Sequence, residues 1–327
     1  MSRLKGLLSF AKRRFLLAIP TLLLVITVVF LLVHLAPGDP VTFLAGEGHV
    51  SDEYIARIRA EYDLDKPIFV QYVKYLSKVL TGDLGISFRY RTPVVKLILE
   101  RLPATLLLMM GAIVLFVGAG IVMGVFAALR PNSVFDMGVS VGAVVGWSVP
   151  LFWLGQMLIV VFALKLGWFP AQGMYNLRNP AIGLAKIPDL LLHLTLPLFT
   201  LGMRYLALGA RMTRASTLEV LSQDYITTAR SKGLAESRVV ARHAVPNALL
   251  PVITLVGMNI GTMLAGSVLT EVVFGWPGMG RLLYDGIYAR DYSLITGIVL
   301  TVSIAVILSN LITDLIYAFI DPRIRYR

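Results

Sequence analysis

A serine flanked by glycines is the first group in this chain whose spacing suggests covalent chemistry. Gly138-Val-Ser140-Val-Gly142 matches the G-x-S-x-G pattern that exposes a nucleophilic serine in hydrolases. That pattern requires a sharp turn between a strand and a helix, whereas this one lies inside a long apolar run. Gly146 continues the four-residue spacing, which is typical of a helix face that packs closely against another helix. We therefore expect helix packing and no intramembrane hydrolase here. The same spacing recurs at Gly120/Gly124 and at Gly257/Gly261.

The other residue types that commonly carry chemistry are not arranged for it. The sequence has no cysteine and 4 histidines, and no two histidines have the H-x-x-x-H spacing of a metal site. They are His34, His49, His193 and His243. The G-x-x-x-x-G-K-[ST] loop that cradles nucleotide phosphates does not occur. We expect no catalytic residue, no metal site and no cofactor in this chain, so any ATP and Mg²⁺ must bind to a partner.

Four polar residues stand out because they lie within apolar runs: Arg204, Asn259, Asn310 and Asp314. Charged residues at such depth usually face the protein interior or a water-filled path. Long side chains near the end of a span also reach back to the interface, and amides often hydrogen-bond between helices. A translocation path, an ion pair between Arg204 and Asp314, and these two plainer roles all stay open.

The composition places the chain in a membrane. Of its 327 residues, 57% are hydrophobic and only 15% are charged, whereas soluble domains carry about 25% charged residues. The net charge of +11 is explained by the excess of Lys and Arg that membrane proteins keep on the cytoplasmic side. Nucleic acid is therefore not an expected partner, and membrane lipid is.

Six stretches reach the roughly 20 apolar residues that cross a bilayer, which predicts an all-α membrane protein. They are 15–35, 102–129, 137–164, 190–210, 248–270 and 293–320. The first is longer than the apolar part of a signal peptide and has no small-x-small cleavage site, so we read it as an uncleaved span. With the N-terminus inside, the inner segments hold 15 Lys and Arg, against 5 in the two short outer loops. Both tails, 1–14 and 321–327, are therefore expected in the cytoplasm.

The long outer loop, 36–101, has 9 basic and 9 acidic residues. Val50-Ser-Asp-Glu has the residues of a helix start. A second helix is expected to begin after Pro67 and to end near Gly82, with one apolar face. That face consists of Ile68, Tyr72, Tyr75, Leu76 and Val79. The loop therefore predicts a small helical cap rather than a solvated linker.

The polar segment between the fourth and fifth spans, 211–247, reads as a surface for another protein. A short helix, Gln223–Lys232, is expected to stop at Gly233 in a left-handed conformation. Pro246 and Pro251 stiffen the return into the fifth span. A loop whose only role was to place positive charge on the cytoplasmic side would not need a glycine and prolines at these positions.

These residues resemble a known family. Thr228-Ala-Arg-Ser-Lys-Gly-Leu234 is similar to the EAA loop of ABC importer permeases, and more narrowly to the B-type permeases of the dipeptide/oligopeptide/nickel group. The general motif prefers Glu and Ala where this chain has Thr227 and Thr228. Further similar segments run in order along the chain: Ala36-Pro-Gly-Asp-Pro40, Gly82-Asp-Leu-Gly85 with Ser87, Arg101-Leu-Pro-Ala-Thr-Leu106, Glu271-Val-Val-Phe-Gly-Trp-Pro-Gly-Met-Gly-Arg281, Arg290-Asp-Tyr292 and Asp321-Pro-Arg323.

The resemblance implies a type I ABC importer permease in the inner (plasma) membrane. Its implied partners are a homologous C-type permease, two cytoplasmic ATPase subunits that bind ATP and Mg²⁺, and an extracytoplasmic binding protein. It also implies that an ATPase contacts the inner segment, with Arg230 and Lys232 pairing with acids, and Tyr225 and Ala229 packing. The whole candidate coupling set is Asp224, Tyr225, Thr228, Ala229, Arg230, Lys232, Gly233, His243, Pro246 and Asn247.

The substrate is less well specified than the class of protein. Members of this group carry peptides, nickel, glutathione or oligosaccharides, and peptides are the first expectation. A proton-coupled secondary transporter is the remote alternative. Such a transporter would use carboxylates within the membrane, and only Asp314 offers one within a span.

Overall fold

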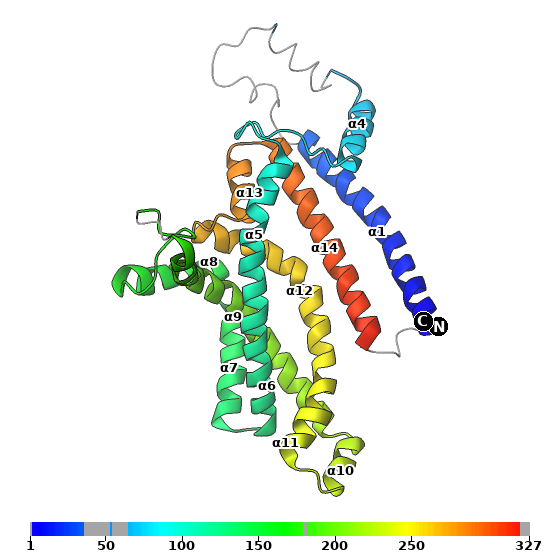
Figure 1. The fold of residues 1–327 in the computed structure, drawn as a ribbon, viewed down its shortest axis with the longest axis vertical. Helices are drawn as coiled ribbons and strands as arrows, with labels where there is room; N and C mark the ends of the chain where they lie inside the picture. The colour runs from blue at the N-terminus through cyan, green and yellow to red at the C-terminus, as the bar shows by residue number, and fades with distance from the viewer. Residues whose placement is uncertain (1, 36–52, 54–64, 179–181, 321–327) are drawn as a thin grey trace. The chain divides into compact units, whose positions relative to one another are not determined.

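The computed structural model describes residues 2–35, 53, 65–178 and 182–320 (Figure 1). The motifs at 36–40 and 321–323 and the expected helix start at 50–52 lie outside the described residues, as does the side chain of Asp314. The described part is built from helices: α1 (Ser2–Leu35), α4 (Ile68–Leu80), α5 (Val94–Ala112), the π-helix η1 (Ile113–Val117), α6 (Gly118–Leu129), α7 (Val134–Ser148), α8 (Leu151–Leu158), the π-helix η2 (Ile159–Lys165), the 3-10 turn η3 (Gly183–Ala185), α9 (Lys186–Leu221), α10 (Asp224–Ser231), α11 (Glu236–Val239), the π-helix η4 (Val240–Ala244), α12 (Val245–Val273), α13 (Met279–Tyr288) and α14 (Tyr292–Ile320).

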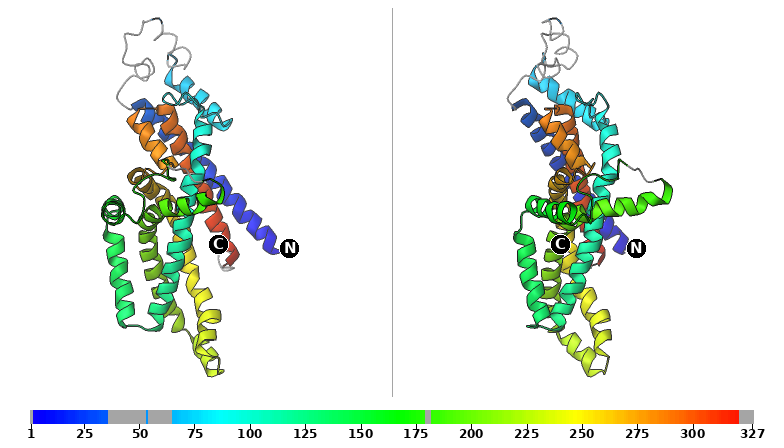
Figure 2. Two further views of the ribbon diagram at one scale, coloured as in Figure 1. Left: turned by 60° about the vertical axis from the view of Figure 1, so that its left-hand side comes forward. Right: turned by 90° about the vertical axis from the view of Figure 1, so that its left-hand side faces the viewer.

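Five described helices are long and apolar enough to cross a membrane, or six if one bent pair counts as a span. The bent pair is the stretch expected as a single span over 137–164. It consists of α7 and the continuous run Leu151–Lys165, at 102° to each other. Pro150 has no N–H for a helix and disfavours helical geometry at the preceding residue. Val149 is accordingly extended, with φ −74° and ψ 126°. Figure 2 shows α8 running across the direction of α7.

The chain divides into two compact units, of which the first covers 1–11, 104–281 and 309–327. Its central element is α9, against which α6, α7, α8 and α12 pack. Helix α6 approaches most closely, because a Cβ on Gly120 or Gly124 would lie 2.6 Å from a backbone oxygen of α9. These two glycines therefore pack as the sequence predicts.

The glycine series on α7 behaves differently along its length. Gly146 faces Met203 and Ala207 of α9, whereas nothing lies within 4 Å of a Cβ on Gly138 or Gly142. The predicted close packing is thus present at the end of the series, and the rest of that face is open in the isolated chain. The core of this unit gathers side chains from α5, α9 and α12 around a buried tryptophan; among them are Leu108, Leu201, Met263 and Trp276.

The second unit covers 12–103 and 282–308. Helix α4 lies on the end of α1, and three aromatic side chains make the contact. The ring of Phe30 is 5.3 Å from that of Tyr72 and 5.6 Å from that of Tyr75. The hydroxyls of Thr27 and Tyr72 are 2.7 Å apart. Burial raises the pKa of Tyr75, opposed by a side-chain hydrogen bond with Thr296. The predicted helix after Pro67 is therefore present, with its aromatic face turned toward α1, although Ile68 is exposed. Its role as an outer cap stays a prediction.

Ser87 and Asp291 join the loop after α4 to the start of α14. The Ser87 hydroxyl donates to Asp291 Oδ2 at 2.5 Å, and the backbone N–H of Arg89 donates to the same oxygen at 3.2 Å. Asp291 Oδ1 accepts from the N–H of Leu294 at 3.1 Å and so caps α14. Both partners are buried, which explains why Ser and Asp stand in these two motifs.

Candidate coupling site

The segment after α9 folds into a tight helical hairpin made of α10, α11 and η4. Helix α9 ends at Leu221 with Ser222 as its C-cap, and Gln223 is extended, with φ −78° and ψ 148°, before α10 begins at Asp224. Helix α10 ends at Ser231, Lys232 is its C-cap, and Gly233 follows with φ +74°. A Cβ on Gly233 would meet nothing within 4 Å, so the backbone conformation and not crowding demands glycine. The left-handed stop that the sequence predicts is confirmed.

The hairpin has an apolar core of its own. Ile226, Ala229, Val239 and Ala244 are buried together, and three partly buried side chains complete the cluster. These are Val220, Leu221 and Leu234. Ala229 is only 7% exposed, so in the isolated chain it packs inside the hairpin and not on the surface that an ATPase would first meet. It sits one helical turn after Ile226 and therefore faces inward.

Arg230 and Glu236 close the hairpin from the outside. Arg230 donates from Nε to Glu236 Oε2 at 3.0 Å and from Nη2 to Oε1 at 2.6 Å. This two-point geometry suits a guanidinium and a carboxylate. The hydrogen bond to Glu236 raises the pKa of Arg230. Arg230 was expected to pair with acids of an ATPase, but in this chain its partner is internal.

The rest of α10 is turned to solvent. Tyr225 is 43% exposed, and Asp224, Thr228 and Lys232 are exposed as well. No ion pair for Lys232 occurs among the residues that the structure describes. At the start of α12, Pro246 and Asn247 are exposed and His243 is half-buried. The Asn247 amide donates to the carbonyl of His243 at 2.8 Å, so it ties η4 to α12.

The comparisons with known proteins agree along the whole chain. Residues 120–326 match the family model of the binding-protein-dependent transport system inner membrane component, and residues 7–109 match the N-terminal model of the same family. The chain belongs to this family of inner membrane components. It is 42% identical over 338 residues to the dipeptide transport system permease protein DppB of Escherichia coli (strain K12), covering 98% of this chain and 100% of that one.

A second relative and one solved structure extend this result. The oligopeptide transport system permease protein AppB of Bacillus subtilis (strain 168) is 42% identical over 315 residues, covering 96% of this chain and 98% of that one. A chain of the MetNI methionine ABC transporter, solved in inward-facing conformations, matches with a TM-score of 0.52 at 19% identity. The match covers 70% of this chain and 96% of that chain, so this inner membrane component has a type I ABC permease-like fold.

Two of the four polar residues suggested for a translocation path, Arg204 and Asn259, have separate partners in this permease. The guanidinium carbon of Arg204 lies 4.1 Å from the ring centroid of Trp147 on α7, close enough for a cation–π contact. The amide of Asn259 donates to the carbonyl of Leu255 at 2.7 Å, and Asn310 is exposed. Sequence reasoning missed the partner of Arg204, because no spacing along the chain links Trp147 to it.

A buried carboxylate at the end of α12 was also missed. Glu271 Oε1 accepts from the Thr105 hydroxyl at 2.7 Å, and Oε2 accepts from the N–H groups of Gly280 and Arg281 at 2.7 and 3.1 Å. The same Thr105 oxygen accepts from the N–H of Met279 at 2.8 Å. All the partners of this carboxylate among the described residues are donors, and they lie at the N-terminus of α13, where negative charge is favoured. The signal was present: Thr105 and Glu271 stand in two of the motif segments.

An ion pair joins the start of α7 to α9. Arg214 donates from Nη2 to Asp136 Oδ2 at 2.7 Å and from Nε to Oδ1. The Asp136 side chain is 4% exposed and that of Arg214 27%. The sequence offered one weak signal, because both residues lie at the ends of apolar runs expected on the same side of the membrane.

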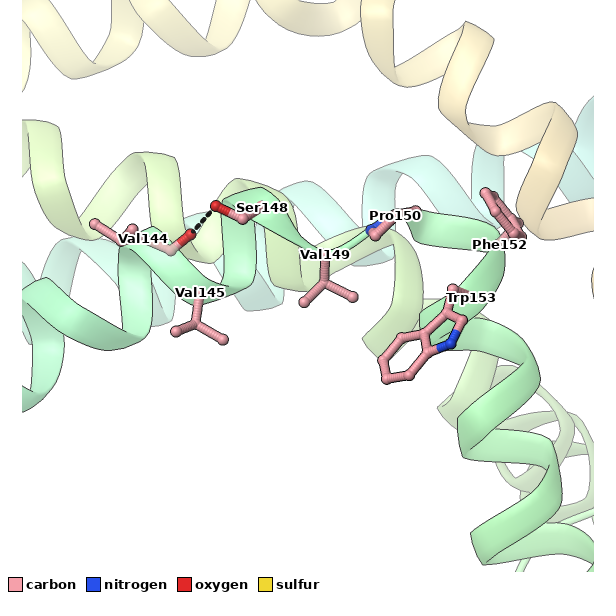
Figure 3. Close-up of a pocket in the computed structure, with 7 residues that line it drawn as sticks. All are labelled: Val144, Val145, Ser148, Val149, Pro150, Phe152 and Trp153. Carbon is pink, nitrogen blue, oxygen red and sulfur yellow. Dashed lines mark hydrogen bonds between the residues drawn. The ribbon is translucent and has the colours of Figure 1, made fainter.

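The elbow between α7 and α8 leaves an open, mostly apolar hollow of about 490 Å³. Figure 3 shows Val145, Val149 and Trp153 turned into the inner angle of the elbow. The hydroxyl of Ser148 is occupied, because it donates to the carbonyl of Val144 at 2.8 Å. The hollow therefore offers apolar surface and little hydrogen-bonding capacity.

Proposed function

We propose that this chain is one transmembrane subunit of an ATP-driven importer of di- and oligopeptides. The observation that carries the substrate class is the near-full-length identity of 42% to permeases of a dipeptide and an oligopeptide system. Similarity confined to the inner segment would support only the ABC class. Here it covers the outer loops as well, which supports a shared way of receiving substrate from a binding protein.

The coupling hairpin, Asp224–Ala244, is proposed to dock into a cytoplasmic ATPase subunit. Support comes from its build: the apolar core fixes its shape, and one face of α10 stays exposed. Tyr225, Thr228 and Lys232 lie on that face, since residues three and four apart share a helix surface. Asp224, Gly233, His243, Pro246 and Asn247 flank it. ATP and Mg²⁺ are assigned to the partner, and both chain termini to the same cytoplasmic side.

A homologous C-type permease is proposed as the second transmembrane subunit. The open face of α7 at Gly138 and Gly142 supports this, because a face without side chains lets another helix approach closely. Replacing Gly142 by Leu is then expected to reduce co-purification of the second permease, whereas the same change at Gly118, which also has nothing within 4 Å, is the matched control.

The outer loop 36–101 is proposed to contact the binding protein, and Arg204, Asn259, Asn310 and Asp314 stay candidates for the translocation path. Deleting 51–80 removes α4 and its aromatic contact with Phe30, while the membrane spans stay intact. The deletion is expected to impair delivery of substrate without loss of the chain from the membrane. Unchanged uptake of substrate by the deletion variant would show that the cap has no role in transport.

Uptake by cells tests the substrate class. A strain that lacks this chain is expected to lose ATP-dependent uptake of a radiolabelled dipeptide and to regain it with the intact gene. Unlabelled peptides should compete with the label, whereas nickel, glutathione and an oligosaccharide should not. Competition by one of those three alone would replace the peptide assignment, and dipeptide uptake that persists without this chain would contradict it.

A further inference from the structure

The Asp136–Arg214 ion pair joins α9 to the turn between α6 and α7. In Figure 1 that turn lies toward the same end of the bundle as α10 and α11. Asp136 belongs to the first turn of α7, and Ser133 caps that helix by accepting from the Asp136 N–H at 3.2 Å. The N–H of Asn132 donates to Asp136 Oδ2 at 2.9 Å. Asn132 has φ +62°, so the same carboxylate also holds a left-handed turn between α6 and α7. One side chain thus fixes the turn and binds it to α9.

Helix α6 is fastened to the same part of α9 by contact of backbones. A Cβ on Gly124 would lie 2.6 Å from the carbonyl oxygen of Ala210 and 2.7 Å from the Cβ of Thr213. Arg214 follows directly after Thr213. The α6–α7 pair is therefore held to α9 twice at one level, once by close packing and once by the ion pair.

Beyond Arg214, α9 continues for seven residues, 215–221, and the hairpin begins at Asp224. Those seven residues span about 10 Å at the helical rise. A displacement of the hairpin is thus applied to α9 close to the ion pair. A two-point guanidinium–carboxylate contact fixes orientation as well as distance, which an apolar contact at that place would not do.

We propose that Asp136 and Arg214 are positioning residues that make the α6–α7 pair move with α9 when an ATPase displaces the coupling hairpin. The proposal rests on the proposed docking of that hairpin. On this proposal the ion pair not only stabilises the fold but also raises the amount of substrate transported for each ATP hydrolysed.

The test uses the transport complex, purified through a tag on this chain and reconstituted in lipid vesicles. Asp136→Asn removes the charge, Arg214→Gln removes the partner, and the double exchange Asp136→Arg with Arg214→Asp restores an ion pair. Arg130→Gln is the control, since it removes an exposed charge at the same turn. Each single variant is expected to lower the transport-to-hydrolysis ratio about fivefold or more, the usual size of coupling between sites. The double exchange should recover part of that loss, and Arg130→Gln should leave the ratio unchanged.

A purely structural role would lower yield, transport and hydrolysis together and leave the ratio unchanged in the complexes that assemble, which would overturn the proposal. Hydrogen exchange in the unaltered complex needs no variant. Amides of residues 131–136 are expected to change protection together with those of α10 when nucleotide is added. Changes in α10 alone would also overturn the proposal. An α10 that the ATPase does not protect at all would instead defeat the docking itself, which separates the two failures.

Discussion

Arg230 and Glu236 form a two-point ion pair within the coupling hairpin, with distances of 3.0 and 2.6 Å. The two residues stand on either side of Gly233, so the pair closes the turn that Gly233 makes. Because Arg230 is paired within the hairpin, the exposed side chains of Tyr225, Thr228 and Lys232 are the ones proposed to reach a partner.

Exchanging the two charges separates an internal from an external role of Arg230. Arg230→Glu alone is expected to reduce coupled transport because it places two carboxylates together, and adding Glu236→Arg is expected to restore it. The effect on unfolding free energy should stay within about 1 kcal/mol, since the pair is exposed. Co-purification of the ATPase and peptide uptake are the measurements. If the double exchange stayed as defective as Arg230→Glu, Arg230 would have its important partner outside this chain.

The left-handed conformation of Gly233 predicts a graded response to substitution. Gly233→Val forces a β-branched residue to positive φ, at a cost of roughly 1–3 kcal/mol, and should uncouple transport from hydrolysis or prevent assembly. Gly233→Asn is the matched control, because Asn tolerates this conformation and the site has room for a side chain. Protease sensitivity of residues 228–240 reports the turn directly. Equal behaviour of the two variants would show that the conformation is not what the site requires.

Thr105 is predicted to act through its hydroxyl. Thr105→Val keeps the shape but leaves the N–H of Met279 without its acceptor and Glu271 with one donor fewer. A buried donor or acceptor that is left without a hydrogen-bond partner lowers the folding stability by about 1–3 kcal/mol. Thermal unfolding of the detergent-purified chain should therefore occur at a lower temperature in Thr105→Val, and close to that of the unaltered chain in Thr105→Ser. Similar melting of both variants would mean that packing alone matters here.

Arg204 is predicted to depend on the aromatic ring beneath it. Trp147→Leu should lower stability by about 0.5–2 kcal/mol, the range for a cation–π contact, and Trp147→Phe by less. Denaturant unfolding in lipid or detergent measures both. The alternative is an ion pair with Asp314, which predicts that Arg204→Asp is rescued by Asp314→Arg. Such a rescue, together with unchanged stability of Trp147→Leu, would show that Arg204 is stabilised by an ion pair with Asp314 and not by the contact with Trp147.

Features that depend on nearby residues were predictable from the sequence. Gly233 marks a left-handed stop because only a few residue types tolerate that conformation, and the face of α4 follows from helical spacing. The length of α9 was underestimated, since the expected span 190–210 follows hydrophobicity whereas the helix continues to Leu221. Hydrogen bonding within a helix does not end where the apolar residues do.

Features that depend on distant partners were not predictable. Hydrophobic spacing on either side of Pro150 is the same whether the helix continues or turns by 102°, although the proline itself was a signal for the break. The basic residues of α10 looked alike, but Arg230 has a partner six positions on and Lys232 does not among the described residues. Asp136 and Arg214 are 78 positions apart, and only the packing of α7 on α9 brings them together.

Single-cysteine cross-linking tests the docking of the coupling hairpin most directly, because the chain has no cysteine of its own. Thr228→Cys places a thiol on the exposed face of α10, and Ala229→Cys places the next one in the buried core. With a short thiol-to-amine cross-linker in the assembled complex, docking through this face predicts a product between the ATPase and Thr228→Cys and none with Ala229→Cys. An assembled, active complex in which Thr228→Cys gives no ATPase product would contradict it.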